Sequence, residues 1–186
     1  PGSAYEVITV GEMPTPEPDP GEVRVRVHAS GISPSDYKRR ASAKGGMEFP
    51  RIVPHSDGAG VVDAIGEGVV AVRPGDRVWV MDAQYKRPFG TAAEYVVLPQ
   101  AKVAVLPDNV SFEAGACLGI PAMTAHVAVS RGGDMKGRDV FISGGAGAVG
   151  HYAVQWAKRF GARVITTVSS AEKAAHAKAA GADYII

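Results

Sequence analysis

A glycine-rich segment at residues 143–150 carries the clearest chemical signal in this sequence. Gly145, Gly147 and Gly150 have the G-x-G-x-x-G spacing, in which the first glycine permits a tight turn, the second lets the backbone approach a pyrophosphate, and the third lets a helix pack closely on a strand. The N-terminus of the helix that follows offers free N–H groups to phosphates. Because the segment follows an apolar strand and opens an amphipathic helix, it predicts a dinucleotide-binding loop formed by Gly145, Ala146, Gly147, Ala148, Val149 and Gly150.

The end of the next strand indicates which dinucleotide binds. Sites for NAD place an acidic residue there, about 20 residues after the loop, to hold the ribose 2′-OH. Here residues 167–173 read T-V-S-S-A-E-K, with no acid at the strand end. Ser169 can donate a hydrogen bond and Lys173 supplies positive charge, which together suit a 2′-phosphate. We therefore expect NADPH rather than NADH, with the reservation that Glu172 could partly neutralise Lys173.

The elements that must position this loop alternate between strand and helix. Strands are predicted at residues 139–143, 163–168 and 184–186, and helices at 148–160 and 170–180. The apolar face of the first helix is expected to consist of Val149, Ala153, Trp156, Ala157 and Phe160. This order predicts a parallel doubly wound sheet. A complete dinucleotide-binding fold has about six strands, so only half is present and we expect a longer polypeptide.

The first 110 residues are predicted to be rich in β-structure. Val23, Val25 and Val27 alternate with polar residues, the pattern of a strand with one solvated face. Four proline residues within 13–20 exclude a helix there. Further strands are expected at residues 58–65, 77–81, 93–98 and 102–106, which suggests a small barrel or a partly open sandwich. Short helices are expected at residues 111–117 and, beginning at Pro121, at 121–130.

Composition restricts the class of protein. The 186 residues have a formal net charge of +1, with 46% hydrophobic and 21% charged residues, typical of an ordinary globular protein. Neither nucleic acid nor a membrane is indicated as a partner. The single cysteine, Cys117, excludes an internal disulfide and a zinc site of four cysteines. We expect Cys117 to be buried in an apolar helix, and the protein to be cytoplasmic.

Taken together, several motifs resemble the zinc-free quinone oxidoreductases (zeta-crystallin-like) of the medium-chain dehydrogenase/reductase superfamily. The matching segments, in chain order, are residues 14–18, 21–23, 29–36, 56–62, 74–78, 90–95, 120–125 and the glycine loop. The resemblance implies a mixed fold. Residues 1–118 would form a GroES-like β-rich catalytic domain, and residues 119–186 the first half of a Rossmann α/β domain that binds NADPH.

The resemblance also implies that no metal is bound. Zinc-dependent relatives have a cysteine at the position of Ser33 and a His-Glu pair at the positions of Ser56 and Asp57. Serine is not a competent zinc ligand at neutral pH. His55 lies one position too early for a ligand, and we interpret it as structural.

The implied activity is hydride transfer from NADPH to a conjugated carbonyl. Without a metal, hydrogen-bond donors must meet the developing oxyanion. By resemblance, Ser33, Ser35 and Tyr37 are the candidate catalytic residues, with turn capping and core packing as their alternative roles. Thr124 matches a threonine that contacts the nicotinamide in relatives, and Tyr85 and Phe89 are candidates for a substrate wall.

Three functions are consistent with the sequence. The first is an NADPH-dependent quinone oxidoreductase. The second is an NADPH-dependent reductase of 2-alkenals, enones or enoyl thioesters, and the third is a non-catalytic NADPH-binding member of the family. Consumption of NADPH with simple quinones would separate an enzyme from a binder. The resemblance further implies a homodimer when the protein is full length.

Overall fold

The computed structural model describes residues 2–41 and 47–186. It divides into two compact units, Pro1–Ile120 and Pro121–Ile186. The expected boundary between a catalytic and a cofactor domain, at residues 118/119, stays a prediction, because compactness alone does not assign a function to either unit.

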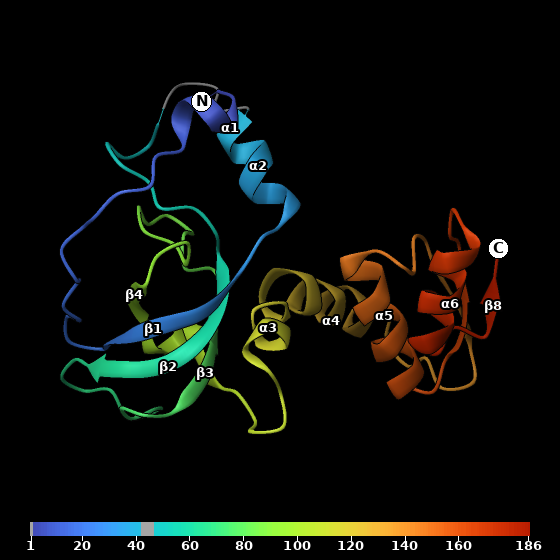
Figure 1. Cartoon of the computed structure of the whole chain (residues 1–186). Helices are drawn as coiled ribbons and strands as arrows, with labels where there is room; N and C mark the ends of the chain where they lie inside the picture. Colours follow the sequence, from blue (N-terminus) through green and yellow to red (C-terminus); the bar gives the residue numbers. More distant parts are fainter. Residues whose placement is uncertain (1, 42–46) are drawn as a thin grey trace. The chain divides into compact units, whose positions relative to one another are not determined.

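The first unit is built on one antiparallel sheet, as the β-rich composition predicted. Its strands lie in the order β4-β1-β2-β3-β5, and the two longest strands, β1 and β2, run side by side (Figure 1). The strand bounds are Glu22–Gly31 for β1, Asp57–Ile65 for β2, Arg77–Val80 for β3, Tyr95–Pro99 for β4 and Val103–Val105 for β5. A small barrel or a partly open sandwich was expected, and the structure has instead one open sheet with β4 and β5 as its edges.

Alternation along β1 produces the core of this unit. Val23 and Val25 have no exposed surface, whereas the arginine side chains between and after them reach the outside. Val27 is only half-buried, because a register shift follows it where β1 pairs with β2. The proline-rich residues 13–19 form neither helix nor strand, as expected.

Short helical elements surround the sheet. Their bounds are Ala4–Val7 for α1, Pro34–Ala41 for α2, Gln100–Lys102 for the 3-10 turn η1, Phe112–Gly115 for α3 and Leu118–Ala122 for the π-helical turn η2. The prediction that Pro121 begins a helix is wrong: Pro121 lies inside η2, and α4 begins at Met123. The backbone N–H of Ile120 donates to the Asp57 carboxylate at 2.7 Å, which holds this turn away from regular helix geometry.

The prediction that Cys117 is buried is also wrong, because its side chain is exposed. The small residues before it take the inner positions. Gly115 approaches the side chain of Leu106 so closely that a Cβ there would lie 2.9 Å from it, and Ala116 is 3% exposed. Cys117 follows on the outer side of the chain.

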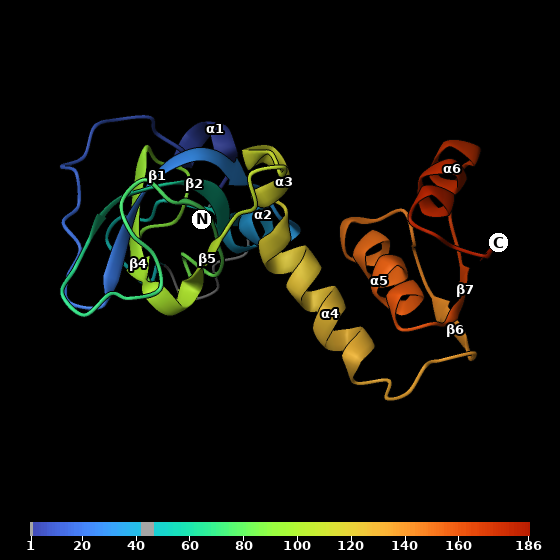
Figure 2. The same cartoon turned by 90° about the horizontal axis from the view of Figure 1, so that it is seen from below.

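The second unit contains the expected parallel sheet. Strands β6 (Asp139–Ile142), β7 (Arg163–Thr166) and β8 (Tyr184–Ile185) lie in sequence order, with β6 and β7 side by side in Figure 2. The helices are α4 (Met123–Ser130), α5 (Ala148–Arg159) and α6 (Ala171–Ala179). The alternating order of strand and helix therefore folds as the sequence predicted.

One residue of the expected apolar face of α5 is misassigned. Ala153 and Ala157 are buried in the apolar cluster that α5 shares with α4 and the sheet, but the third buried side chain is Val154, and Val149 is 39% exposed. Val149 lies in the first turn of α5, where its neighbour is the glycine loop and not a strand. The predicted periodicity is therefore correct except at the end that meets the loop.

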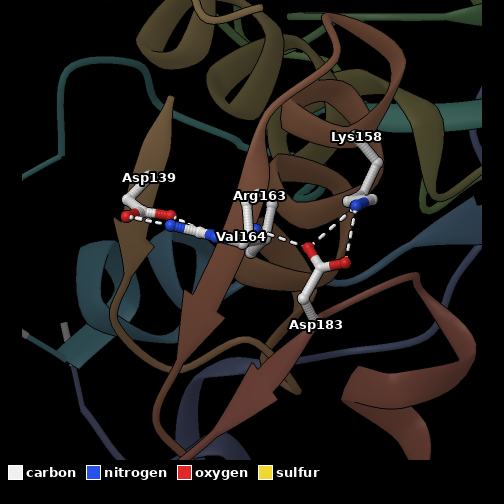
Figure 3. Close-up of polar contacts among 5 residues, drawn as sticks. All are labelled: Asp139, Lys158, Arg163, Val164 and Asp183. Atoms are coloured by element: carbon white, nitrogen blue, oxygen red, sulfur yellow. Dashed lines mark hydrogen bonds and ion pairs between the residues drawn. The ribbon is translucent and has the colours of Figure 1, made fainter. Parts of the chain in front are cut away.

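Acidic side chains tie the strands and α5 together at one end of this sheet (Figure 3). Asp139 on β6 binds the guanidinium of Arg163, its register partner on β7. Asp183, just before β8, accepts from Lys158 Nζ at 2.8 and 2.9 Å and from the Val164 N–H at 2.6 Å. Three elements therefore meet at the Asp183 carboxylate.

We expect Asp183→Asn to lower the free energy of unfolding of this unit by about 1 kcal/mol, since the contacts are charge-assisted but partly exposed. The lysine and the backbone N–H lower the pKa of Asp183 below its ordinary 3.8. The difference in the free energy of unfolding between the wild type and Asp183→Asn should therefore reach its full value above pH 4 and disappear in stronger acid. Urea unfolding in a double-mutant cycle with Lys158→Met measures the pair, and zero coupling would contradict this prediction.

Candidate functional site

Two threonines at the end of the following strand, Thr166 in β7 and Thr167 just after it, hold the glycine loop in place. The N–H of Gly145 donates to Thr166 Oγ1 at 2.9 Å, and the N–H of Gly144 donates to Thr167 Oγ1 at 3.0 Å. Thr166 has no exposed surface and in turn donates to the carbonyl of Ile142 at 2.5 Å. The loop between β6 and α5 is thus anchored to the carboxyl end of β7.

The glycines of the motif have different roles from those expected. The left-handed backbone of the turn belongs to Gly144 (φ +69°), and Gly145 has no positive φ. A Cβ on Gly145 would lie 2.3 Å from Thr166 Oγ1, so Gly145 provides close packing and not the turn. A Cβ on Gly150 would lie 2.1 Å from the Gly144 carbonyl oxygen, so α5 packs there on its own loop and not on a strand.

The start of α5 fits a phosphate group. Gly147 is the N-cap residue and has no side chain to accept from the first turn of the helix. The N–H groups of that turn have no partner within the helix. An anion placed there is bound by these donors and by the positive end of the helix dipole.

An open pocket of about 420 Å³ lies beside this helix start. Its lining consists of Ser143, Gly144, Ala146, Gly147, Thr167, Val168, Ser169 and Lys173. The Nζ of Lys173 donates to Ser169 Oγ at 2.8 Å, so the cation reaches back to the strand end. Glu172 makes no ion pair with it among the described residues. The geometry therefore does not support the expectation that Glu172 partly neutralises the charge of Lys173.

The structure separates the predicted cofactor residues into groups. Ala146, Gly147, Ser169 and Lys173 line the pocket together. Gly145 and Gly150 lie behind it as packing positions, while Ala148 and Val149 are exposed in the first turn of α5. Thr124 is exposed in the first turn of α4 and is not part of the pocket lining.

Sequence reasoning missed four lining residues: Ser143, Gly144, Thr167 and Val168. All four lie at or just after the carboxyl ends of β6 and β7. Carboxyl ends of neighbouring parallel strands meet at one edge of a sheet, which is where open α/β sheets bind ligands. That rule, applied to the predicted strands, would have found them.

The candidate catalytic hydroxyls lie where α2 begins in the first unit. The Oγ atoms of Ser33 and Ser35 are 2.5 Å apart. Ser33 is 9% exposed, and its N–H donates to the Asp36 carboxylate at 2.7 Å, an arrangement that caps α2. Ser35 is exposed and Tyr37 is 52% exposed, so the structure brings the two serines together but not Tyr37.

Asp57 is a buried carboxyl that sequence reasoning considered only as a substituted metal ligand. It is 3% exposed, and burial raises its pKa to about 6. Its Oδ2 accepts from the Ile120 N–H, while its Oδ1 has no hydrogen-bond partner among the described residues. The nearby charges of Asp82 and Asp36 raise the pKa further. A charge in this position is costly to the fold.

His55 has the left-handed backbone that favours glycine, with φ +75°. Its Nδ1 lies 2.8 Å from Ser30 Oγ, which lies 2.8 Å from Thr91 Oγ1. Thr91 is fully buried and donates to the carbonyl of Asp57 at 2.5 Å. These contacts are consistent with the structural role expected for His55.

The candidate substrate residues lie in an irregular segment after β3. Tyr85 is 56% and Phe89 41% exposed. The Nζ atoms of Lys86 and Lys102 lie 5.5 and 5.7 Å from the centre of the Tyr85 ring, which makes this aromatic side chain the centre of a cationic patch. A role in substrate binding stays a prediction for both residues.

Possible metal ligands do not gather in the described residues. No group of three or more His, Cys, Asp or Glu side chains is placed there to hold a metal ion. Ser33 and Ser56 are both nearly buried and supply only hydroxyl oxygens.

Among the described residues, no helix has the length and apolar character needed to cross a membrane.

Comparison with known proteins assigns this chain to a family. Residues 19–108 match the alcohol dehydrogenase GroES-like domain, and residues 148–186 match the family described as zinc-binding dehydrogenase. The chain belongs to the medium-chain dehydrogenase/reductase superfamily. Its fold is the GroES-like domain followed by part of a Rossmann-type domain.

Individual relatives cover nearly all of this chain. It is 35% identical to a quinone oxidoreductase from Pseudomonas aeruginosa over 95% of its length, and 33% identical to a 2-methylene-furan-3-one reductase from Solanum lycopersicum over 100%. The structure of the Escherichia coli quinone oxidoreductase complexed with NADPH matches 97% of the chain with 30% identity and a TM-score of 0.81, and this chain covers 54% of it. The chain covers 53% and 49% of the two sequence relatives, so it spans about half their length.

Proposed function

We propose that the protein is an NADPH-dependent oxidoreductase that reduces a quinone without a metal. The observation that carries the proposal is the pocket at the carboxyl ends of β6 and β7, where Lys173 and Ser169 lie 2.8 Å apart beside the start of α5. A cation and a hydroxyl in place of an acid suit a 2′-phosphate. The relatives named quinone oxidoreductases support the choice of acceptor.

The residues present fit a dinucleotide. Cβ atoms at Gly145 and Gly150 would collide with the loop's own supports, so the loop conformation depends on glycine there. Gly147 and the first turn of α5 would bind the pyrophosphate, and Ser169 and Lys173 the 2′-phosphate. When bound, the nicotinamide supplies a hydride, and the protein's task is to orient it and exclude water.

In the first unit, we assign the hydroxyl pair of Ser33 and Ser35 to the acceptor oxygen. Ser33 is buried and fixed by Asp36, and it lies 2.5 Å from Ser35, which is exposed. One hydroxyl of such a pair donates to the other, and the second is free to donate outward. A donor of this kind stabilises negative charge that develops on a carbonyl oxygen. Tyr37, Thr124, Tyr85 and Phe89 stay candidates by resemblance.

A second candidate function uses the same cofactor site. The tomato relative is named for reduction of a methylene-furanone, which is an enone. An enone accepts hydride at carbon and also develops charge on its oxygen, so the serine pair would serve both substrates. The choice between the two substrates depends on the residues that line the substrate side, for which Tyr85 and Phe89 are the candidates by resemblance.

The deciding experiment measures oxidation of NADPH and of NADH with 1,4-benzoquinone and with a 2-alkenal. We expect NADPH oxidation with the quinone that a zinc chelator leaves unchanged. Oxidation with the alkenal alone favours the enone reductase. If the protein binds NADPH but oxidises it with neither acceptor, the non-catalytic alternative replaces this proposal. Inhibition by the chelator would overturn the metal-free mechanism.

Lys173→Ala should remove most of the preference for NADPH. Hydrogen bonds to charged groups contribute about 1.5–3 kcal/mol, so the ratio of the NADH and NADPH dissociation constants should fall roughly tenfold to a hundredfold. Lys178→Ala, an exposed lysine on the same helix, is the control and should leave the ratio unchanged. An unaltered ratio in Lys173→Ala would place the 2′-phosphate elsewhere.

The homodimer of the full-length protein and its cytoplasmic location remain predictions. Size-exclusion chromatography with light scattering, on the intact protein, measures the first of these.

A further inference from the structure

Two histidines outside the pocket form an aromatic stack between α5 and α6. The rings of His151 and His176 lie 4.1 Å apart between centroids and are inclined by 18°. His151 is half-buried, and its Nδ1 is buried with no hydrogen-bond partner among the described residues. His176 is exposed.

Each histidine of the stack lies one helical turn after a residue that lines the pocket. His151 follows Gly147 by four residues, and its N–H donates to the Gly147 carbonyl at 2.8 Å. His176 follows Lys173 by three residues on α6. Residues three and four apart lie on the same face of a helix. The separation of the rings is therefore coupled to the separation of Gly147 and Lys173, which both line the pocket.

We propose that the His151–His176 stack is a pH-dependent spacer that sets the distance between the pyrophosphate side and the 2′-phosphate side of the proposed dinucleotide pocket. The inference rests on the proposed function and concerns regulation of that same site. His151 and His176 act as positioning residues, because neither lines the pocket.

The chemistry of the pair gives the direction of the effect. Burial and, to a smaller extent, the charge of His176 lower the pKa of His151 from its ordinary 6.5. Stability from the neutral stack is therefore complete above pH 6.5 and is lost as the pH falls below that value. Two protonated rings at this separation repel, and the buried Nδ1 has no acceptor for its proton. Acidification should therefore separate α5 from α6 and weaken ligand binding.

Other ionisable groups on the neighbouring elements do not account for this shift. They are Tyr152 on α5, Glu172 and Lys173 on α6, His126 on α4, and the Asp139–Arg163 pair on β6 and β7. His176 is the one charged group that changes the pKa of His151 appreciably. The pair can therefore be tested by removing the charge of one ring alone.

The test uses ADP-ribose, whose pyrophosphate stays ionised between pH 5.5 and 8, and calorimetry on the intact protein. We expect the dissociation constant to rise about five- to tenfold from pH 8 to pH 5.5. His176→Phe keeps an aromatic ring in the stack and removes the repulsion between two protonated rings. It should reduce this change to about two- to threefold, and the remainder comes from the burial of His151. His126→Phe is the matched control and should behave as the wild type.

A second measurement follows the imidazole signals by nuclear magnetic resonance. The titration midpoint of His151 should rise in His176→Phe, which a merely structural contact would not produce. Equal pH dependence of ADP-ribose binding in the wild type and in His176→Phe overturns the spacer but leaves the dinucleotide site intact. No binding of ADP-ribose at pH 8 overturns the proposed site and the spacer with it.

Discussion

Gly150→Ala should weaken NADPH binding about a hundredfold. The new Cβ would lie 2.1 Å from the Gly144 carbonyl oxygen and 2.8 Å from its carbonyl carbon, both of which are backbone atoms that cannot rotate away. The loop must therefore move and carry its pyrophosphate-binding N–H groups out of place. Loss of one hydrogen bond to a charged group costs about 1.5–3 kcal/mol, which is up to roughly a hundredfold in the dissociation constant. Fluorescence titration with NADPH and NADH measures the loss, which should be similar for both because the pyrophosphate is common to them.

Gly11→Ala is the matched control for this substitution. No atom lies within 4 Å of a Cβ at that position, and its φ is an ordinary one. This variant should bind and unfold as the wild type does. Circular dichroism shows whether Gly150→Ala remains folded, since overpacking costs about 1–3 kcal/mol. A folded Gly150→Ala protein that binds NADPH with a dissociation constant within threefold of the wild type would contradict the assigned role of this glycine.

Asp57→Asn should stabilise the first unit at neutral and alkaline pH. Burial is the largest cause that raises the pKa of Asp57 from 3.8 to about 6. The folded state therefore binds a proton that the unfolded state releases, and stability decreases as the pH rises from about 4 to about 6. With 1.36 kcal/mol for each pKa unit, the shift corresponds to about 3 kcal/mol above pH 6. Asparagine avoids this cost and keeps an oxygen for the Ile120 N–H.

Urea unfolding from pH 4 to pH 8 tests the prediction. The difference between Asp57→Asn and the wild type should be small at pH 4, grow to about 3 kcal/mol by pH 6–7, and then stay constant. Asp108→Asn is the control, since the Asp108 side chain is fully exposed. If Asp57→Asn is less stable than the wild type at pH 8, the carboxylate has a compensating partner that the described contacts do not include.

The local patterns determined most of the fold. Alternation of Val23 and Val25 with arginines placed β1 and the core side of its sheet, because side chains on a strand point to opposite faces. The order of strand and helix after residue 138 defined the parallel sheet. The glycine spacing located the proposed dinucleotide loop, since few sequences between a strand and a helix satisfy it.

The errors fall where the chain turns from one element to the next. The sequence predicts a helix that begins at Pro121, but the Asp57 carboxylate, 63 residues before Ile120, binds the backbone of that turn. The sequence predicts a buried Cys117, but Gly115 and Ala116 take the inner positions. In each case the deciding contact is distant in sequence or depends on which side of a short helix faces the sheet.

The sequence by itself determined the class of this protein, the position of the proposed dinucleotide loop, and the cation and hydroxyl proposed to bind a 2′-phosphate. Only the tertiary structure decided how the parts of the site are held. It assigned the tight turn to Gly144, brought Thr166 and Thr167 under the loop, and stacked His151 on His176. The physical reason is the range of the interactions. Turns, caps and periodic burial follow from neighbouring residues, whereas a hydrogen bond or ring contact between two elements depends on how they pack.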